Sequence, residues 1–249
     1  MRKSMRIGAS TDLGKTRPIN EDNYYVSEYV SRPGVIYAMV ADGMGGHNAG
    51  ETASEAAVNG VSDYINRYYT TEVPQEQIKD MLIGAINSVN KAIYTEAQDN
   101  AKFYGMGTTL TACFYYAGRV TVAHVGDSRA YVLRDDLMHK ITSDHSLVAE
   151  LLANGQITPE QARNHPQKNV ITRAVGTDPH IEIDIYEFDV QEGDIILLCT
   201  DGLSNMLSDK EMQTLISENK KMEDAAEKLV SAANDKGGFD NITAVLLQI

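Results

Sequence analysis

The sequence predicts an α+β domain in which antiparallel sheets carry helices on their outer faces. Two long amphipathic segments come first, and a block of short apolar runs joined by tight turns follows them. Two further amphipathic segments then precede a closing apolar run. The apolar face of each amphipathic segment is too large to lie in water, so it must pack against something flat, which a sheet supplies.

The first predicted elements are one strand and two helices. Residues 34–41 (GVIYAMVA) form a short apolar run with β-branched and aromatic side chains, which is typical of a buried strand. Residues 50–69 and residues 74–99 place apolar side chains at helical spacing, so each segment is expected to be a helix with one buried face.

The middle of the chain predicts a block of strands. Residues 108–116, 120–125 and 129–133 are apolar runs with very short connections. Connections of that length can join only antiparallel neighbours, so these three runs are expected to pair in order.

The last part of the chain predicts three strands and two helices. The strands are expected over residues 181–190, 194–200 and 242–249. Between the last two, helices are expected from about Ser208 and from Met222. The pattern Ser208-x-x-Glu211 matches a capping box, which supports the first of these helix starts.

Residues 142–177 form a long connection between two predicted strands. A short helix is expected near residues 146–153, and Thr158-Pro159-Glu160-Gln161 has the composition of a second, capped helix start. Connections this long are often lids or binding loops, although a merely decorative insertion is the alternative. No repeat or linker divides the rest, so residues 1–249 are expected to form a single domain with this insertion.

Composition excludes several classes of function. The 249 residues carry 22 basic and 35 acidic side chains, for a net charge of −13, which argues against binding to nucleic acid or to an anionic membrane. No apolar run reaches the roughly 20 residues of a membrane helix, and the N-terminus lacks the apolar stretch of a signal peptide, so a cytoplasmic protein is expected. Cys113 and Cys199 lie inside apolar runs and do not suggest a disulfide.

Four aspartates stand where apolar runs end, and they predict a metal site. They are Asp42, Asp127, Asp201 and Asp240. Any one of them could simply mark a turn, but four carboxylates at strand ends would repel one another unless divalent cations neutralised them. Oxygen donors favour Mg²⁺ or Mn²⁺ over Zn²⁺. The six histidines show no zinc-type pairing, and His47 and His145 stay candidates because they lie beside the acidic motifs.

Arg17 lies close in sequence to two further acids, Glu21 and Asp22. A guanidinium fork near carboxylates could hold a phosphoryl group beside a metal, although an arginine among acids is more often a surface ion pair.

Three segments resemble nucleotide- or phosphate-binding motifs, but each departs from its motif at a required position. Residues 8–16 resemble a P-loop, but five residues separate Gly8 from Gly14 where the motif needs four. Asn48 stands where a dinucleotide fingerprint needs its third glycine. Cys113 and Arg119 have the spacing of thiol phosphatases, but the residues between them indicate a strand and a turn.

Eight segments occur in one order from Thr11 to Thr243. They are TDLGKTRPINED, VADGMGGHNAG, GMGTTL, VGDSRAY, SDHS, HPQKN, CTDGLSN and GGFDNIT. With this ordered set the sequence resembles the metal-dependent PPM-type (2C-class) serine/threonine protein phosphatases, particularly the small bacterial members.

The resemblance implies a four-layer αββα sandwich with a metal centre at one end of two antiparallel sheets. It also implies hydrolysis of phosphoserine and phosphothreonine in proteins by direct attack of a water that bridges two Mn²⁺ or Mg²⁺ ions, with a third ion possible. Residues 142–177 match the family's mobile flap. The expected partners are phosphoproteins, the substrates of a cognate serine/threonine kinase, and the expected state is a monomer. A non-catalytic pseudophosphatase is the alternative, and it would be expected to lack metal ligands.

The resemblance also implies a role for each matching residue. Asp42 would bridge the two ions, and the Gly43 carbonyl, Asp201 and Asp240 would complete their protein ligands. Asp127, together with Asp201, matches the site of the third ion.

Four other positions complete the implied site. Glu21 and Asp22 match residues that act through metal-bound water, and Arg17 matches the phosphate-binding arginine. Some relatives carry a proposed general-acid histidine directly after the Asp-Gly pair, where this sequence has Met44. His47 lies three residues further on and is the candidate for that role, and a metal-bound water is the alternative proton donor.

Overall fold

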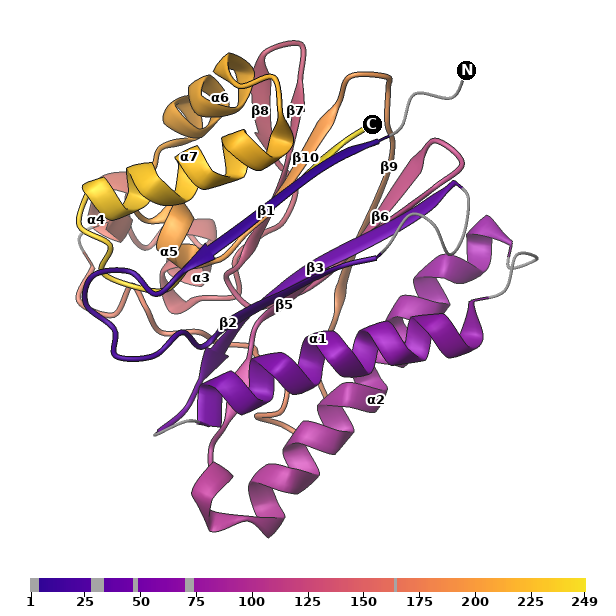
Figure 1. Ribbon diagram of the computed structural model, residues 1–249. Coiled ribbons are helices and arrows are strands. Elements are labelled where there is room, and N and C mark those ends of the chain that lie inside the picture. The colour runs from indigo at the N-terminus through magenta and orange to yellow at the C-terminus, as the bar shows by residue number, and fades with distance from the viewer. Residues whose placement is uncertain (1–4, 28–33, 47–48, 70–73, 164) are drawn as a thin grey trace.

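The computed structural model describes residues 5–27, 34–46, 49–69, 74–163 and 165–249. Two antiparallel sheets lie face to face, and a pair of long helices covers the outer side of each sheet (Figure 1). The arrangement confirms the four-layer αββα sandwich that the family resemblance implies, and the sheets with helices on their outer faces that the sequence pattern predicts.

The first sheet has five strands, and every neighbouring pair is antiparallel. In spatial order they are β1 (Arg6–Asp12), β11 (Ile242–Gln248), β10 (Ile195–Cys199), β7 (Arg129–Arg134) and β8 (Leu137–Lys140). Helices α6 (Asp209–Glu218) and α7 (Met222–Asp235) pack on its outer face.

The second sheet is also antiparallel. In spatial order its strands are β2 (Asp22–Val26), β3 (Val35–Met44), β5 (Leu110–Tyr116), β6 (Arg119–Val125) and β9 (Asp184–Asp189), with β4 (Gly107–Thr108) paired to the end of β3. Its outer face is covered by α1 (Ala49–Tyr68) and α2 (Ile78–Asp99). Single-turn helices at Gln75–Gln77 and Ala101–Phe103 flank α2.

Both faces of β3 are buried, which explains why its sequence is apolar without interruption. Tyr37 and Met39 point into the core beneath α1 and α2, whereas Ile36 and Val40 point into the core between the two sheets. A strand buried on both faces needs no polar alternation, because neither face meets water.

The structure corrects the expected pairing of the middle strands. Strands β5 and β6 pair as predicted, but β6 belongs to the second sheet and β7 to the first. The three residues between them carry the chain from one sheet to the other. Gly126 makes this crossing with a φ of 112°, a conformation that L side chains rarely adopt.

Three strands were not predicted. Strands β1, β8 and β2 lie at sheet edges and are partly exposed, so their apolar signal is weak. The short helix α5 (Asp201–Ser204) and the single turn at Ala101–Phe103 were not predicted either. The remaining helices and strands form close to their expected residues, and the capping box between Ser208 and Glu211 is present.

Residues 142–177 contain two short helices, and the chain then comes back close to the place where the segment begins. Helix α3 (Leu147–Ala153) is capped by Ser146, and α4 (Pro159–Arg163) begins after Thr158. A bridge pairs Ser146 with Ile171, so the two ends of this segment lie side by side. In the described part of the chain, no helix has both the length and the apolar character needed to span a bilayer.

Candidate metal centre

The predicted aspartates come together at one end of the sandwich, each from a different element. Asp42 lies in β3, two residues before its end, and pairs in register with Asp22 of β2. Asp127 lies in the crossing between the sheets, and Asp201 begins the short helix α5 (Asp201–Ser204). Asp240 stands two residues before β11.

The backbone around Asp42 is held on both sides. Its N–H donates to Thr109 Oγ1 (2.9 Å), and its carbonyl accepts from Thr108 Oγ1 (2.9 Å) and from Thr109 N–H (2.9 Å). The next residue must be glycine, because a Cβ at Gly43 would collide with the carbonyl of Gly50.

One carboxylate oxygen of Asp22 connects the two sheets by hydrogen bonds, and the other oxygen has no hydrogen-bond partner among the described residues. Its Oδ2 accepts hydrogen bonds from Thr200 (2.8 Å) and Thr243 (2.7 Å), which lie on the opposite sheet's side of the site. Its Oδ1 is buried and finds no partner among the described residues. Burial raises the pKa of Asp22 to about 7, although the two hydroxyls oppose the rise.

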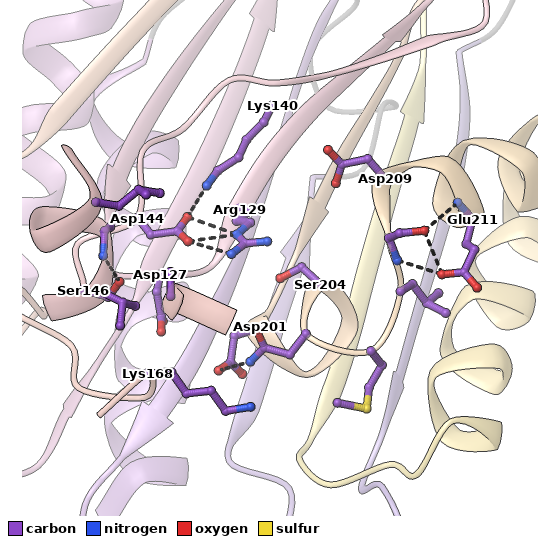
Figure 2. Close-up of a pocket in the computed structure, with 18 of the residues that line it drawn as sticks. Asp127, Arg129, Lys140, Asp144, Ser146, Lys168, Asp201, Ser204, Asp209 and Glu211 are labelled. Atoms are coloured by element: carbon purple, nitrogen blue, oxygen red, sulfur yellow. Dashed lines mark hydrogen bonds and ion pairs between the residues drawn. The ribbon is translucent and has the colours of Figure 1, made fainter. Parts of the chain in front are cut away.

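Asp127 is a buried acid that forms no ion pair within the described part of the chain, although the charge of Arg129 opposes the rise of its pKa. The guanidinium of Arg129, two residues further along the chain, donates to Asp144 through Nε (3.0 Å) and Nη2 (2.7 Å) rather than to Asp127 (Figure 2). Asp127 Oδ1 has no hydrogen-bond partner within the described ranges. Burial, then the charges of Asp201 and Asp144, raise the pKa of Asp127 to about 7.

Three further acids of the site, Asp42, Asp201 and Glu21, also have raised pKa values. Burial and the neighbouring aspartates, first Asp22 and then Asp201, raise the pKa of Asp42 well above its usual range. Burial also raises the pKa of Asp201 and of Glu21. So many carboxylates cannot all ionise together without a counter-charge.

The donor set fits hard divalent cations. The buried oxygens Glu21 Oε1, Asp22 Oδ1 and Asp127 Oδ1 lack partners among the described residues. Carboxylate and carbonyl oxygens are the ligands that Mg²⁺ and Mn²⁺ prefer. In the same ranges no three His, Cys, Asp or Glu side chains are close enough together to hold a metal ion as they stand. The acids therefore lie at the same end of the sandwich without converging on one point.

Arg17 lies at the mouth of the site. Its Nη2 donates to Asp240 Oδ2 (2.8 Å), and nearly half of its side chain is exposed, which leaves donors of the fork directed to solvent. Asn241 holds the loop that carries it: its amide donates to the carbonyls of Leu13 and Ile19, and its Oδ1 accepts from Glu21 N–H (2.8 Å).

A cleft of about 870 Å³ opens beside Asp127 and Asp201. One wall consists of α3, α4 and the residues that follow, including Lys168, and the other consists of α5 and the start of α6 (Figure 2).

The structure brings together the predicted acids, Gly43 and Arg17, and it adds Thr200 and Asn241 to the site. His47 lies outside the described residues. His145 is not a metal ligand, because its ring nitrogens face Gly126 and Asp184. Sequence reasoning missed Thr200 and Asn241, although each stands beside a predicted acid in Thr-Asp-Gly and Asp-Asn.

Buried cysteines and the glycine-rich start of the chain are not part of the site. Cys113 and Cys199 are buried free thiols, and burial raises the pKa of each to about 12. Gly8 lies inside β1, so residues 8–16 do not form a phosphate-binding loop. Both findings confirm the predictions.

The sandwich fold and its all-oxygen acidic centre are those of a metal-dependent hydrolase of phosphate esters. Protein phosphatase 2C is the family whose pattern matches residues 16–246. The serine/threonine phosphatase stp of Listeria innocua is 42% identical over 238 residues, which are 96% of this chain and 93% of that protein. Protein phosphatase PhpP of Streptococcus pneumoniae is 40% identical over 98% of both chains.

Solved structures agree with these relatives. The serine/threonine phosphatase of S. agalactiae has a TM-score of 0.92 and 38% identity, covering 99% of this chain and 100% of that one. The catalytic domain of the phosphatase PstP, solved in complex with two manganese ions, has a TM-score of 0.85 and 33% identity, covering 98% and 97%. The chain belongs to the protein phosphatase 2C family and is a metal-dependent serine/threonine phosphatase.

Proposed function

We propose that this phosphatase works with two Mn²⁺ or Mg²⁺ ions and has a site for a third. Asp42, the Gly43 carbonyl, Asp201 and Asp240 would hold the two ions, with Asp42 shared between them. Asp127 would hold the third together with Asp201.

Three buried carboxylate oxygens without a partner among the described residues carry this proposal, since each is aimed into a cluster of acids that needs positive charge. Two of them belong to Glu21 and Asp22, which would act through water bound to the ions. The relative PstP, which was solved with two manganese ions, supports the number.

When bound, the ions would supply a water nucleophile at neutral pH and offset the charge of the phosphoryl oxygens. Arg17 would bind the phosphoryl group through the free part of its guanidinium fork, while its contact with Asp240 keeps the fork at the mouth of the site. His47 stays the proposed proton donor to the leaving group, and a pH–rate profile of His47→Asn tests that role.

The substrates we propose are phosphoserine and phosphothreonine proteins that a cognate serine/threonine kinase has modified. The cleft of about 870 Å³ beside Asp127 and Asp201 would receive residues next to the phosphorylated one, and residues between Asp144 and Lys168 form one of its walls. We therefore propose that these residues act as a flap that controls access within a single phosphatase domain, and that the enzyme is a monomer in the cytoplasm.

The test is phosphate release from a phosphothreonine peptide with and without Mn²⁺, after treatment with a chelator. Chelation should abolish turnover and Mn²⁺ should restore it. Asp240→Asn should weaken the restoration, whereas Asp63→Asn, at an exposed position of α1, should behave like the wild type. Full turnover in thoroughly metal-stripped protein would refute the proposal.

A further inference from the structure

His145 lies where the flap (residues 142–177) joins the sandwich, and its contacts reach three separate segments. Its side chain is 8% exposed. The ring Nδ1 accepts a hydrogen bond from the N–H of Gly126 (3.0 Å). The ring Nε2 lies 3.3 Å from Asp184 Oδ2 and 3.1 Å from Arg173 Nη1. The backbone N–H donates to Gly126 O (2.7 Å), and the carbonyl accepts from Thr172 N–H (2.9 Å). One residue therefore touches the sheet crossing, β9 and the far end of the flap.

The contacts of the ring select one tautomer. A proton on Nδ1 would point at the N–H of Gly126 and would leave Nε2 facing the carboxylate of Asp184 without a proton. A proton on Nε2 satisfies the contacts with Gly126 and Asp184. Arg173 Nη1, although 3.1 Å from Nε2, has other acceptors for its two protons, Asp184 Oδ1 (2.9 Å) and the Glu182 carbonyl (3.4 Å), and Nη2 donates to Glu182 Oε2 (3.2 Å). Burial and the charge of Arg173 lower the pKa of His145, which keeps the ring neutral at neutral pH.

Gly126 is confined from two sides. On one side a Cβ at this position would collide with the side chain of Thr109, whose hydroxyl accepts from Asp42 N–H and contacts Ser128 Oγ (2.7 Å). On the other side His145 makes two hydrogen bonds to the same residue. The peptide that leads directly into Asp127 is thus fixed by a residue that belongs to the flap.

We propose that His145 is a positioning residue that holds the Gly126 peptide so that Asp127 faces the cleft, and that it links this acid to both ends of the flap. The proposal rests on the proposed role of Asp127 as a ligand of the third ion. In this arrangement, a shift of the flap's ends would move the Gly126 peptide, and the affinity of the third site would depend on the position of the flap.

The first test uses the unmodified enzyme. Long-range ¹H–¹⁵N NMR of the metal-free protein at neutral pH should show His145 as the neutral Nε2–H tautomer, with an unprotonated Nδ1 that accepts a hydrogen bond. The Nδ1–H tautomer, or a charged ring, would overturn the proposal. This measurement needs no variant and no activity, so it holds even if substitutions at His145 prevent folding.

The second test replaces His145 by asparagine or by glutamine, so that the contacts of Nδ1 and of Nε2 are removed separately. His145→Asn places an oxygen where Nδ1 lies and keeps the bond to Gly126, whereas His145→Gln reaches the Nε2 position and loses that bond. Folding is checked by circular dichroism, and His139→Asn, at an exposed position of β8, is the matched control. The readouts are Mn²⁺ binding by titration calorimetry and hydrogen exchange of the segment around Gly126.

We expect the weakest Mn²⁺ site to lose about tenfold in affinity in His145→Gln, the size expected for one lost buried hydrogen bond, and to be unchanged in His145→Asn. Exchange at Gly126 should rise only in the Gln variant, and exchange at the flap end near Thr172 should rise in the Asn variant. Equal Mn²⁺ binding by both variants would overturn the positioning role. If Asp127→Ala binds Mn²⁺ at the weakest site as tightly as the wild type does, the proposed role of Asp127 as a ligand of the third ion is wrong. That result differs from one in which Asp127→Ala loses the site and the two His145 variants bind Mn²⁺ equally, which would overturn only the role of His145.

Discussion

Replacing Asp127 by asparagine should stabilise the metal-free protein while weakening its metal binding. Asp127 is 8% exposed, and burial, followed by the charges of Asp201 and Asp144, raises its pKa from 3.8 to about 7. In the folded state without metal, the ionised carboxylate is therefore a cost that asparagine does not carry.

The magnitude follows from the pKa difference. A rise of about 3 pKa units corresponds to about 4 kcal/mol of stability lost when the carboxylate is fully ionised. The folded protein binds more protons than the unfolded chain between about pH 4 and pH 7, so this cost grows as the pH rises through that window and is complete above it. Burying an amide with unsatisfied groups costs about 1–2 kcal/mol. The net gain at pH 8 is about 2 kcal/mol, or about 4–8 °C in melting temperature for a chain of this size.

The assay is thermal and urea unfolding of Asp127→Asn and the wild type in a chelator, at pH 8 and at pH 5. At pH 5 the cost in the wild type falls below about 2 kcal/mol, so the gain should disappear. Saturating Mn²⁺ should reverse the order, because the bound ion stabilises the wild type more. The reasoning would be refuted if Asp127→Asn were no more stable than the wild type at pH 8. It would also be refuted if the gain in stability at pH 5 were as large as at pH 8. Asp63→Asn is the exposed control.

Three further outcomes are expected. Arg17→Lys keeps the charge but loses the fork, so kcat/KM on a phosphopeptide should fall about tenfold, or about 1.4 kcal/mol; unchanged kinetics would remove Arg17 from the site. Asp201→Asn should reduce both metal content and kcat more than Asp127→Ala does, and only Asp127→Ala should keep two ions by metal analysis; the reverse order would contradict the shared role of Asp201. Leu82→Ala empties part of the core beneath α2, where Leu82 is fully buried, and should lower the free energy of unfolding by about 3 kcal/mol in a urea titration while leaving Mn²⁺ affinity unchanged. An equal loss of affinity would mean that this core and the site are coupled.

Much of the architecture could be predicted because its signals are local. Helices α1 and α2 follow from apolar residues at helical spacing, and α6 follows from the capping box at Ser208. The edge strands β1, β2 and β8 escaped prediction because a strand that is exposed along one side need not be apolar.

The partners of particular side chains could not be predicted, because they depend on long-range pairing. Nothing near Arg129 in the chain shows that its guanidinium binds Asp144, so that Asp127 Oδ1 has no hydrogen-bond partner among the residues the structure describes. Likewise, the hydroxyls that hold Asp22 belong to Thr200 and Thr243, far along the chain.

The sequence by itself determined the chemistry of the site: aspartates where apolar runs end, oxygen donors suited to Mg²⁺ or Mn²⁺, and an arginine able to bind phosphate. Only the tertiary structure decided which strands share a sheet, and therefore that β6 and β7 lie in different sheets with Asp127 at the crossing between them. Only the tertiary structure could raise the pKa values of Asp22, Asp42 and Asp127, because burial and the distance between charges are properties of the folded chain.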